Sequence, residues 1–247
     1  MNAPRPERVP LPPAAEVLGE AVALYGRNAS MFITVAVAGA LVGNLAGLLL
    51  SPSGFVAALV WSQIIAALIT GFQAPVWLLA VLARRGDPLT SAAALYGAVT
   101  LLPRFFIVGL VLGVGGGMLL LISYYLPALA LPALPVLIYF AVRFSLSGPA
   151  IVLERRTPLQ ALVRSWKVVE GNWWRTFLVQ LPVLLFAIIL VAASGAASSA
   201  VESALLSAVV GAVALGVSAP LVALVETALF EEYSGGQPRA VEEGAEE

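Results

Sequence analysis

The sequence predicts an all-α polytopic membrane protein with six transmembrane helices in three hairpins, each hairpin preceded by a cytoplasmic amphipathic surface helix. Three observations lead to this prediction: the length of the apolar stretches, the alternation of charge between them, and a threefold repeat. Apolar residues make up 60% of the 247 residues and charged residues 11%. Soluble domains are less apolar and more charged than this.

Six apolar stretches are each near or above the roughly 20 residues that a helix needs to cross a hydrocarbon core of about 30 Å. They cover 31–50, 55–83, 103–123, 133–153, 174–194 and 204–227. The fourth contains Ser147-Gly148-Pro149, which should kink it, because proline removes a helical hydrogen bond.

Apart from Arg143, which lies inside the fourth apolar stretch, basic residues are confined to alternate connections. They are Arg5, Arg8 and Arg27, then Arg84, Arg85 and Arg104, then Arg155, Arg156, Arg164, Lys167 and Arg175, and finally Arg239. The three intervening turns, near 51–54, 123–132 and 195–203, contain neither Lys nor Arg. The positive-inside rule therefore predicts cytoplasmic termini and outward-facing turns. With twelve Arg against one Lys, the composition suggests a bacterial inner-membrane protein.

The chain contains no cysteine and no histidine. Thiol nucleophiles, imidazole bases and His/Cys metal sites are therefore excluded. We expect no enzymatic activity, no cofactor and no metal, and nucleic acid is not an expected partner, because the net charge is only −1. The first 30 residues lack the apolar core of a cleaved signal peptide, so the first crossing should direct insertion.

Prolines mark three similar units. Pro13, Pro88 and Pro158 are 70 to 75 residues apart, and each precedes a short helical segment and two crossings. This predicts a transmembrane domain over 13–230, between a disordered tail at 1–12 and an acidic disordered tail at 231–247. Helical loops in an unrepeated protein are the alternative.

The clearest surface helix is predicted after Pro158, with Thr157 as its cap and Gln160 completing a capping box. Its apolar face should carry Leu159, Leu162, Val163, Trp166 and Val169. Basic and aromatic side chains around this segment are candidates for contact with lipid headgroups. They are Arg155, Arg156, Arg164, Lys167, Arg175, Trp166 and Trp174.

Small residues spaced by four occur in the first crossing of each unit. They are Gly39, Gly43 and Gly47, then Gly109, Gly113 and Gly117, then Ala192, Ala196 and Ala200. Such ridges let helix backbones approach closely in lipid. We therefore expect a central cluster of tightly packed helices. Packing alone accounts for the ridges, so they do not indicate transport.

Polar side chains at bilayer depth are costly and must face protein or water. They are Asn44, Gln63, Gln73, Arg143, Gln180 and Glu226. At a rise of about 1.5 Å per residue, Asn44, Gln63 and Arg143 lie about 10 to 15 Å from the outer ends of their spans. These three side chains could therefore meet. Arg143, Asn44, Gln63 and Glu226 are thus a candidate intramembrane polar site, either a structural lock or a substrate site.

The stretch 143–177, RFSLSGPAIVLERRTPLQALVRSWKVVEGNWWRTF, resembles the bacterial glycerophosphoryl diester phosphodiesterase membrane-domain family. The matching positions are Arg143, Glu154, Pro158, Leu159, Ser165, Trp166, Gly171, Trp174 and Arg175. The resemblance implies a six-span membrane part without a catalytic domain, because only 17 residues follow Phe230 and histidine is absent.

These observations predict a noncatalytic membrane scaffold or accessory subunit. Its expected partners are membrane lipids and, as a further candidate, another membrane protein. The alternative is a small-molecule or lipid transporter or channel with a polar site around Arg143.

Overall fold

The computed structural model describes residues 12–49, 53–126, 128, 130–199 and 203–235, and all regular structure within them is helical. Six helical stretches are long and apolar enough to cross a membrane. They are Ala29–Leu48, Phe55–Arg85, Val99–Leu119, Leu131–Leu153, Trp173–Ser199 and Ala204–Ser234. The predicted all-α polytopic membrane protein is confirmed. The two predicted disordered tails lie almost wholly outside the described residues.

Ten helices make up the described part of the chain. They are α1 (Ala14–Arg27), α2 (Ala29–Leu48), α3 (Phe55–Phe72), α4 (Ala74–Arg85), α5 (Ser91–Tyr125), α6 (Ala130–Phe144), α7 (Ser147–Leu153), α8 (Pro158–Val169), α9 (Trp173–Ser199) and α10 (Ala204–Ser234). The second crossing is broken at Gln73, just before Pro75, and the fourth before Ser147. The predicted interruption of the fourth span is confirmed.

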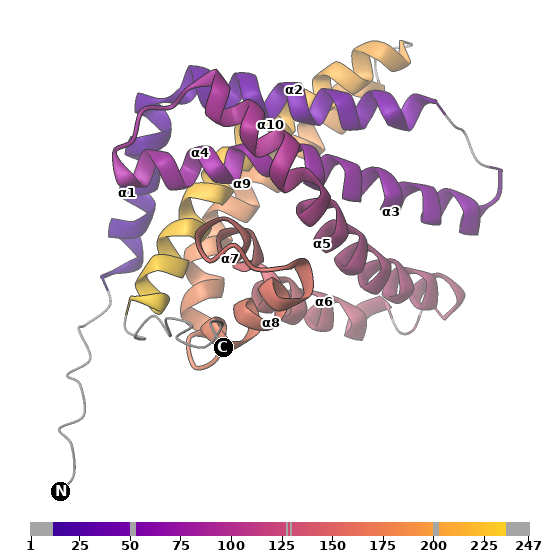
Figure 1. Ribbon diagram of the computed structural model, residues 1–247. Helices are drawn as coiled ribbons and strands as arrows, with labels where there is room; N and C mark the ends of the chain where they lie inside the picture. The colour runs from indigo at the N-terminus through magenta and orange to yellow at the C-terminus, as the bar shows by residue number, and fades with distance from the viewer. Residues whose placement is uncertain (1–11, 50–52, 127, 129, 200–202, 236–247) are drawn as a thin grey trace, which may run out of the picture.

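Three hairpins diverge from a common base in Figure 1. The hairpins are α2–α3, α5–α6 and α9–α10, and the base contains α1, α4, α7 and α8. At the base, α4, α7 and α10 contact one another. Their buried side chains include Leu79, Ile151 and Leu224, and every residue of α10 from 223 to 230 is buried. Close dispersion contacts hold this core together, since burial of apolar groups does not by itself drive association in lipid.

The helix that begins each unit packs on the second crossing of the unit before it. α8 packs on α7, the start of α5 packs on α4, and α1 packs on α10. The last contact joins the first unit to the third, so the three predicted units follow one another around a ring.

The middle unit differs from the other two. α5 begins at Ser91, where the Thr90 hydroxyl accepts a hydrogen bond from the Ala93 N–H at 3.1 Å, and it continues through Pro103 into the crossing. The segment after Pro88 is therefore not a separate surface helix. No glycine or cap residue between it and the crossing ends the helix, and Pro103 removes only one backbone donor.

The first two glycine ridges both face α3. A Cβ at Gly39 or Gly43 would overlap Phe72 or Ile69, and a Cβ at Gly109 would lie 2.9 Å from the Ala67 Cα. α3 is thus held between α2 and α5, which confirms close packing through these ridges.

The third ridge does not pack in this way, because Ala192 and Ala196 are exposed; Ala200 lies outside the described residues. The prediction of a ridge contact in the third unit is wrong. Close contact with the third unit is made instead by Gly216 of α10, where a Cβ would overlap Val37 of α2.

Candidate functional site

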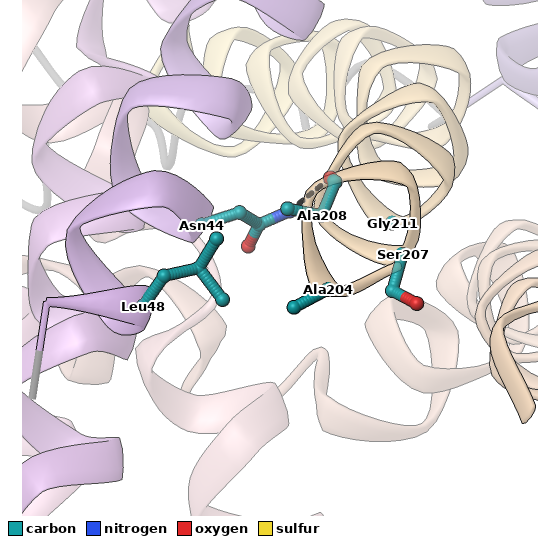
Figure 2. Close-up of a pocket in the computed structure, with 6 residues that line it drawn as sticks. All are labelled: Asn44, Leu48, Ala204, Ser207, Ala208 and Gly211. Carbon is teal, nitrogen blue, oxygen red and sulfur yellow. Dashed lines mark hydrogen bonds between the residues drawn. The ribbon is translucent and has the colours of Figure 1, made fainter. Parts of the chain in front are cut away.

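Asn44 joins α2 to α10. Its Nδ2 donates to the Ala208 carbonyl at 3.1 Å, as Figure 2 shows. The pair lies beside an open pocket of about 490 Å³. The pocket is lined by Asn44, Leu48, Ala204, Ser207, Ala208 and Gly211.

Gln63 lies between α3 and α5. Its side chain covers the glycine ridge of α5, where a Cβ at Gly113 would lie 2.9 Å from Gln63 Oε1. Its Nε2 donates to the Ser62 hydroxyl at 3.3 Å. Gln63 therefore fills the space that the glycines leave open.

Arg143 lies at the end of α6 and contacts α8. Its Nε donates to the Tyr139 hydroxyl and its Nη1 to the Trp166 carbonyl, each at 3.1 Å. The guanidinium carbon lies 4.7 Å from the centre of the Trp166 ring and 5.3 Å from that of Tyr139. The faces of these two rings attract the cationic guanidinium.

The prediction that Asn44, Gln63 and Arg143 meet is wrong. The hydrogen-bond partner of Asn44 lies on α10, that of Gln63 within α3 and that of Arg143 on α8. The position of a residue along a span determines the depth of its side chain, but it does not determine which neighbouring helix that side chain contacts. Arg143 donates instead to a backbone carbonyl of α8.

Glu226 also stands apart from the other three. It is 8% exposed on α10, and within the described part of the chain its carboxyl has no hydrogen bond or ion pair. Glu226 is buried because the base of the bundle surrounds this turn of α10. Gln73 is equally buried, and its Nε2 donates to the Ala36 carbonyl at 2.9 Å.

α8 begins as predicted, with the Gln160 side chain accepting from the Thr157 N–H at 3.3 Å. Its buried face carries Ala161, Leu162, Ser165, Val168 and Val169. Ser165 donates to the Arg143 carbonyl at 2.7 Å, which binds α8 to α6.

The predicted apolar face of α8 is divided between protein and surroundings. Leu162 and Val169 are buried, whereas Leu159 is 63% exposed and Val163 is 56% exposed. Trp166 is half-buried, and its ring packs against Phe144 of α6. The helix therefore carries two apolar stripes, of which one is covered by α7 and α6 and the other is open.

Carboxylates neutralise three of the cations assigned to lipid headgroups. Glu154 lies 2.9 Å from Arg164 and 3.1 Å from Arg156, and Glu232 lies 2.8 Å from Arg175. Arg156 and Arg164 thus share one carboxylate, and Arg175 has its own. Contact of these three side chains with headgroups stays a prediction.

The other predicted headgroup residues are differently placed. The Arg155 side chain is exposed, and its carbonyl accepts from Arg104 at 3.3 Å. Lys167 is exposed and has no ion pair among the described residues, and Trp174 is 70% exposed. These three side chains remain free to contact lipid.

Aromatic rings form a continuous cluster where α6, α8 and α9 meet. The Tyr139 ring lies 6.0 Å from Trp166 and 5.9 Å from Trp173 between ring centres, and Phe144 lies 5.6 Å from Trp166. Trp173 Nε1 donates to the Tyr139 carbonyl at 3.3 Å. We call this group, together with Phe140, the aromatic cluster; it surrounds Arg143.

Sequence reasoning missed the acidic partners of the basic residues. Glu20, Glu154, Glu231 and Glu232 each pair with an arginine. The signal in the sequence for these ion pairs was the presence of acids beside basic loops at the ends of spans.

Comparison of the chain with protein-family models, curated proteins and solved structures gives no match.

Proposed function

We propose that the protein is a noncatalytic scaffold or accessory subunit of a bacterial inner membrane, with cytoplasmic termini, and that it binds anionic lipid around α8 and the start of α9. In this proposal α8 is an amphipathic helix at the inner interface.

The observation that carries the proposal is the open stripe of α8. Leu159 and Val163 are exposed one helical turn apart, and exposed Lys167 follows one turn later. Trp174 is exposed at the start of α9. Apolar side chains flanked by a cation and an indole suit a membrane interface, where the chains contact acyl groups and the ammonium contacts phosphate.

The separation of the polar residues favours a scaffold over a transporter. Asn44, Gln63 and Arg143 have different helices as partners, so they do not line one path. The base of the bundle, where α4, α7 and α10 meet, is filled largely by apolar side chains. A rigid base with a lipid-binding surface suits a protein that positions itself or a partner at the membrane.

Thermal unfolding of the purified full-length protein in neutral detergent tests the proposal. Added phosphatidylglycerol should raise the unfolding temperature more than added phosphatidylcholine. Lys167→Gln should weaken this preference by about 1 kcal/mol, the energy of one basic residue beside anionic headgroups. Arg85→Gln, at an exposed position on α4, is the matched control. Equal stabilisation of the wild type by both lipids would contradict the proposal.

A further inference from the structure

Arg143 lies inside the fourth membrane span, and no carboxylate of a described residue pairs with its charge. Among the described residues, the ion pairs at this end of the bundle involve Arg84, Arg156, Arg164 and Arg175, each with a glutamate. Among the residues that the structure describes, the Arg143 guanidinium contacts a hydroxyl, a carbonyl and two rings. An uncompensated cation in a largely apolar setting attracts an anion.

The guanidinium retains a donor for such an anion. Nε and Nη1 are held by Tyr139 and Trp166, which orients the group, whereas Nη2 has no hydrogen bond to a described residue. A guanidinium fixed by stacking and two hydrogen bonds is well suited to phosphate, whose oxygens accept charge-assisted hydrogen bonds. The aromatic cluster also places Arg143 among the ring types that collect at the headgroup level of membranes.

The adjoining surface can accept acyl chains. Elsewhere in the ring, α2 packs along α10 and α5 packs along α3, but α6 contacts α9 mainly near Tyr139–Trp173 and Ser145–Gln180. Away from these contacts, Leu131 and Leu134 of α6 and Ile188 and Ile189 of α9 are exposed. Apolar surface therefore extends from the cation toward the bilayer interior.

We propose that Arg143, Tyr139 and Trp166 form a binding site for the phosphodiester of an anionic glycerophospholipid, whose acyl chains lie along the exposed faces of α6 and α9. This inference rests on the proposed lipid-binding function and assigns its ligand class and its central residue. A net-anionic headgroup is favoured, because no carboxylate of the described part of the chain contacts Arg143 to receive the ammonium of a zwitterionic lipid. Exposed Lys167 adds positive charge beside Trp166.

Native mass spectrometry of the full-length protein tests the site. The protein is released from micelles with equal amounts of phosphatidylglycerol and phosphatidylcholine, and the retained lipids are counted. Arg143→Gln should lower the ratio of retained phosphatidylglycerol to phosphatidylcholine by about tenfold, the effect of losing one charge-assisted contact. Arg143→Lys should keep part of the preference, because lysine retains the positive charge but lacks the planar set of N–H donors of a guanidinium. Arg85→Gln, which removes an exposed charge of α4, should lower the ratio less than Arg143→Gln does.

Two outcomes overturn the site. The first is a folded Arg143→Gln protein that retains phosphatidylglycerol as the wild type does. If Lys167→Gln still weakens the preference, only this inference fails; if the wild type has no preference, the proposed function fails as well. The second is displacement of the lipid by excess inorganic phosphate, which would make free phosphate the ligand.

Photo-crosslinking keeps the test decisive if Arg143→Gln does not fold. A photoreactive phenylalanine analogue replaces Phe140 in the aromatic cluster or, as a control, exposed Leu205 of α10. The adducts at position 140 should be enriched in phosphatidylglycerol relative to those at 205. Equal composition at both positions would contradict the site with Arg143 intact.

Discussion

Arg84 Nε lies 2.7 Å from Glu231 Oε2, which joins the end of the second crossing to the end of the last helix. Glu20 of α1 lies 3.2 Å from the same guanidinium. The arginine side chain is 12% exposed and that of Glu231 is 33% exposed, so solvent screens this network only in part. It connects α1, α4 and α10 at the base of the bundle.

Glu231→Ala should therefore destabilise the protein. The expected loss is about 1 to 3 kcal/mol, because the variant leaves a largely buried guanidinium with one exposed partner. The thermal unfolding temperature in detergent measures the loss. Glu16→Ala, at an exposed acidic position of α1, should have little effect. Equal unfolding temperatures for the two variants would show that the Arg84–Glu231 pair contributes no stability.

A leucine at Gly43 should disrupt the fold far more than a leucine at Gly115. A side chain at Gly43 would overlap Ile69 of α3, whereas no atom lies within 4 Å of a Cβ at Gly115. Overpacking costs about 1 to 3 kcal/mol and here displaces backbone as well. Size-exclusion chromatography after heating should show early loss of the Gly43→Leu protein. Similar behaviour of both variants would mean that α2 and α3 are not in close contact.

Gln73→Met should leave stability nearly unchanged. The amide makes one hydrogen bond, to Ala36, and its Oε1 is buried without a partner among the described residues. Methionine removes both the bond and the unsatisfied oxygen, and hydrogen bonds within membranes average about 0.6 kcal/mol. Gln73→Glu should destabilise the protein, since it buries a carboxyl at the same position. A loss above about 2 kcal/mol for Gln73→Met would indicate a further partner, such as buried water.

The orientation of the chain can be tested with single cysteines, because the protein has none. Ser53, Ala128 and Ser199 are exposed in or near the three turns, and Arg85 is exposed at the opposite end of its crossing. An impermeant maleimide should label cysteines at the first three positions in intact cells and label Arg85→Cys only after lysis. Labelling of Arg85→Cys in intact cells would reverse the predicted orientation. A cysteine at Gln237 would extend the test to the C-terminal tail, outside the described residues.

Local features of the chain were predictable because their causes are local. The lengths of the six crossings follow from the apolar stretches. The start of α8 follows from Thr157 and Gln160, and the break before α7 follows from Pro149 and its neighbours. The close approach at Gly43 follows from the absence of a side chain.

The sequence by itself determined the class of protein, its crossings and the positions where its helices begin, break or approach closely, because each depends on residues within a few turns of one another. Only the tertiary structure decided that Arg143 contacts Trp166 rather than Gln63, that Arg164 pairs with Glu154, and that Ala192 faces outward. Helical periodicity shows which residues share a face, but the neighbour of that face depends on how separate helices pack around the ring.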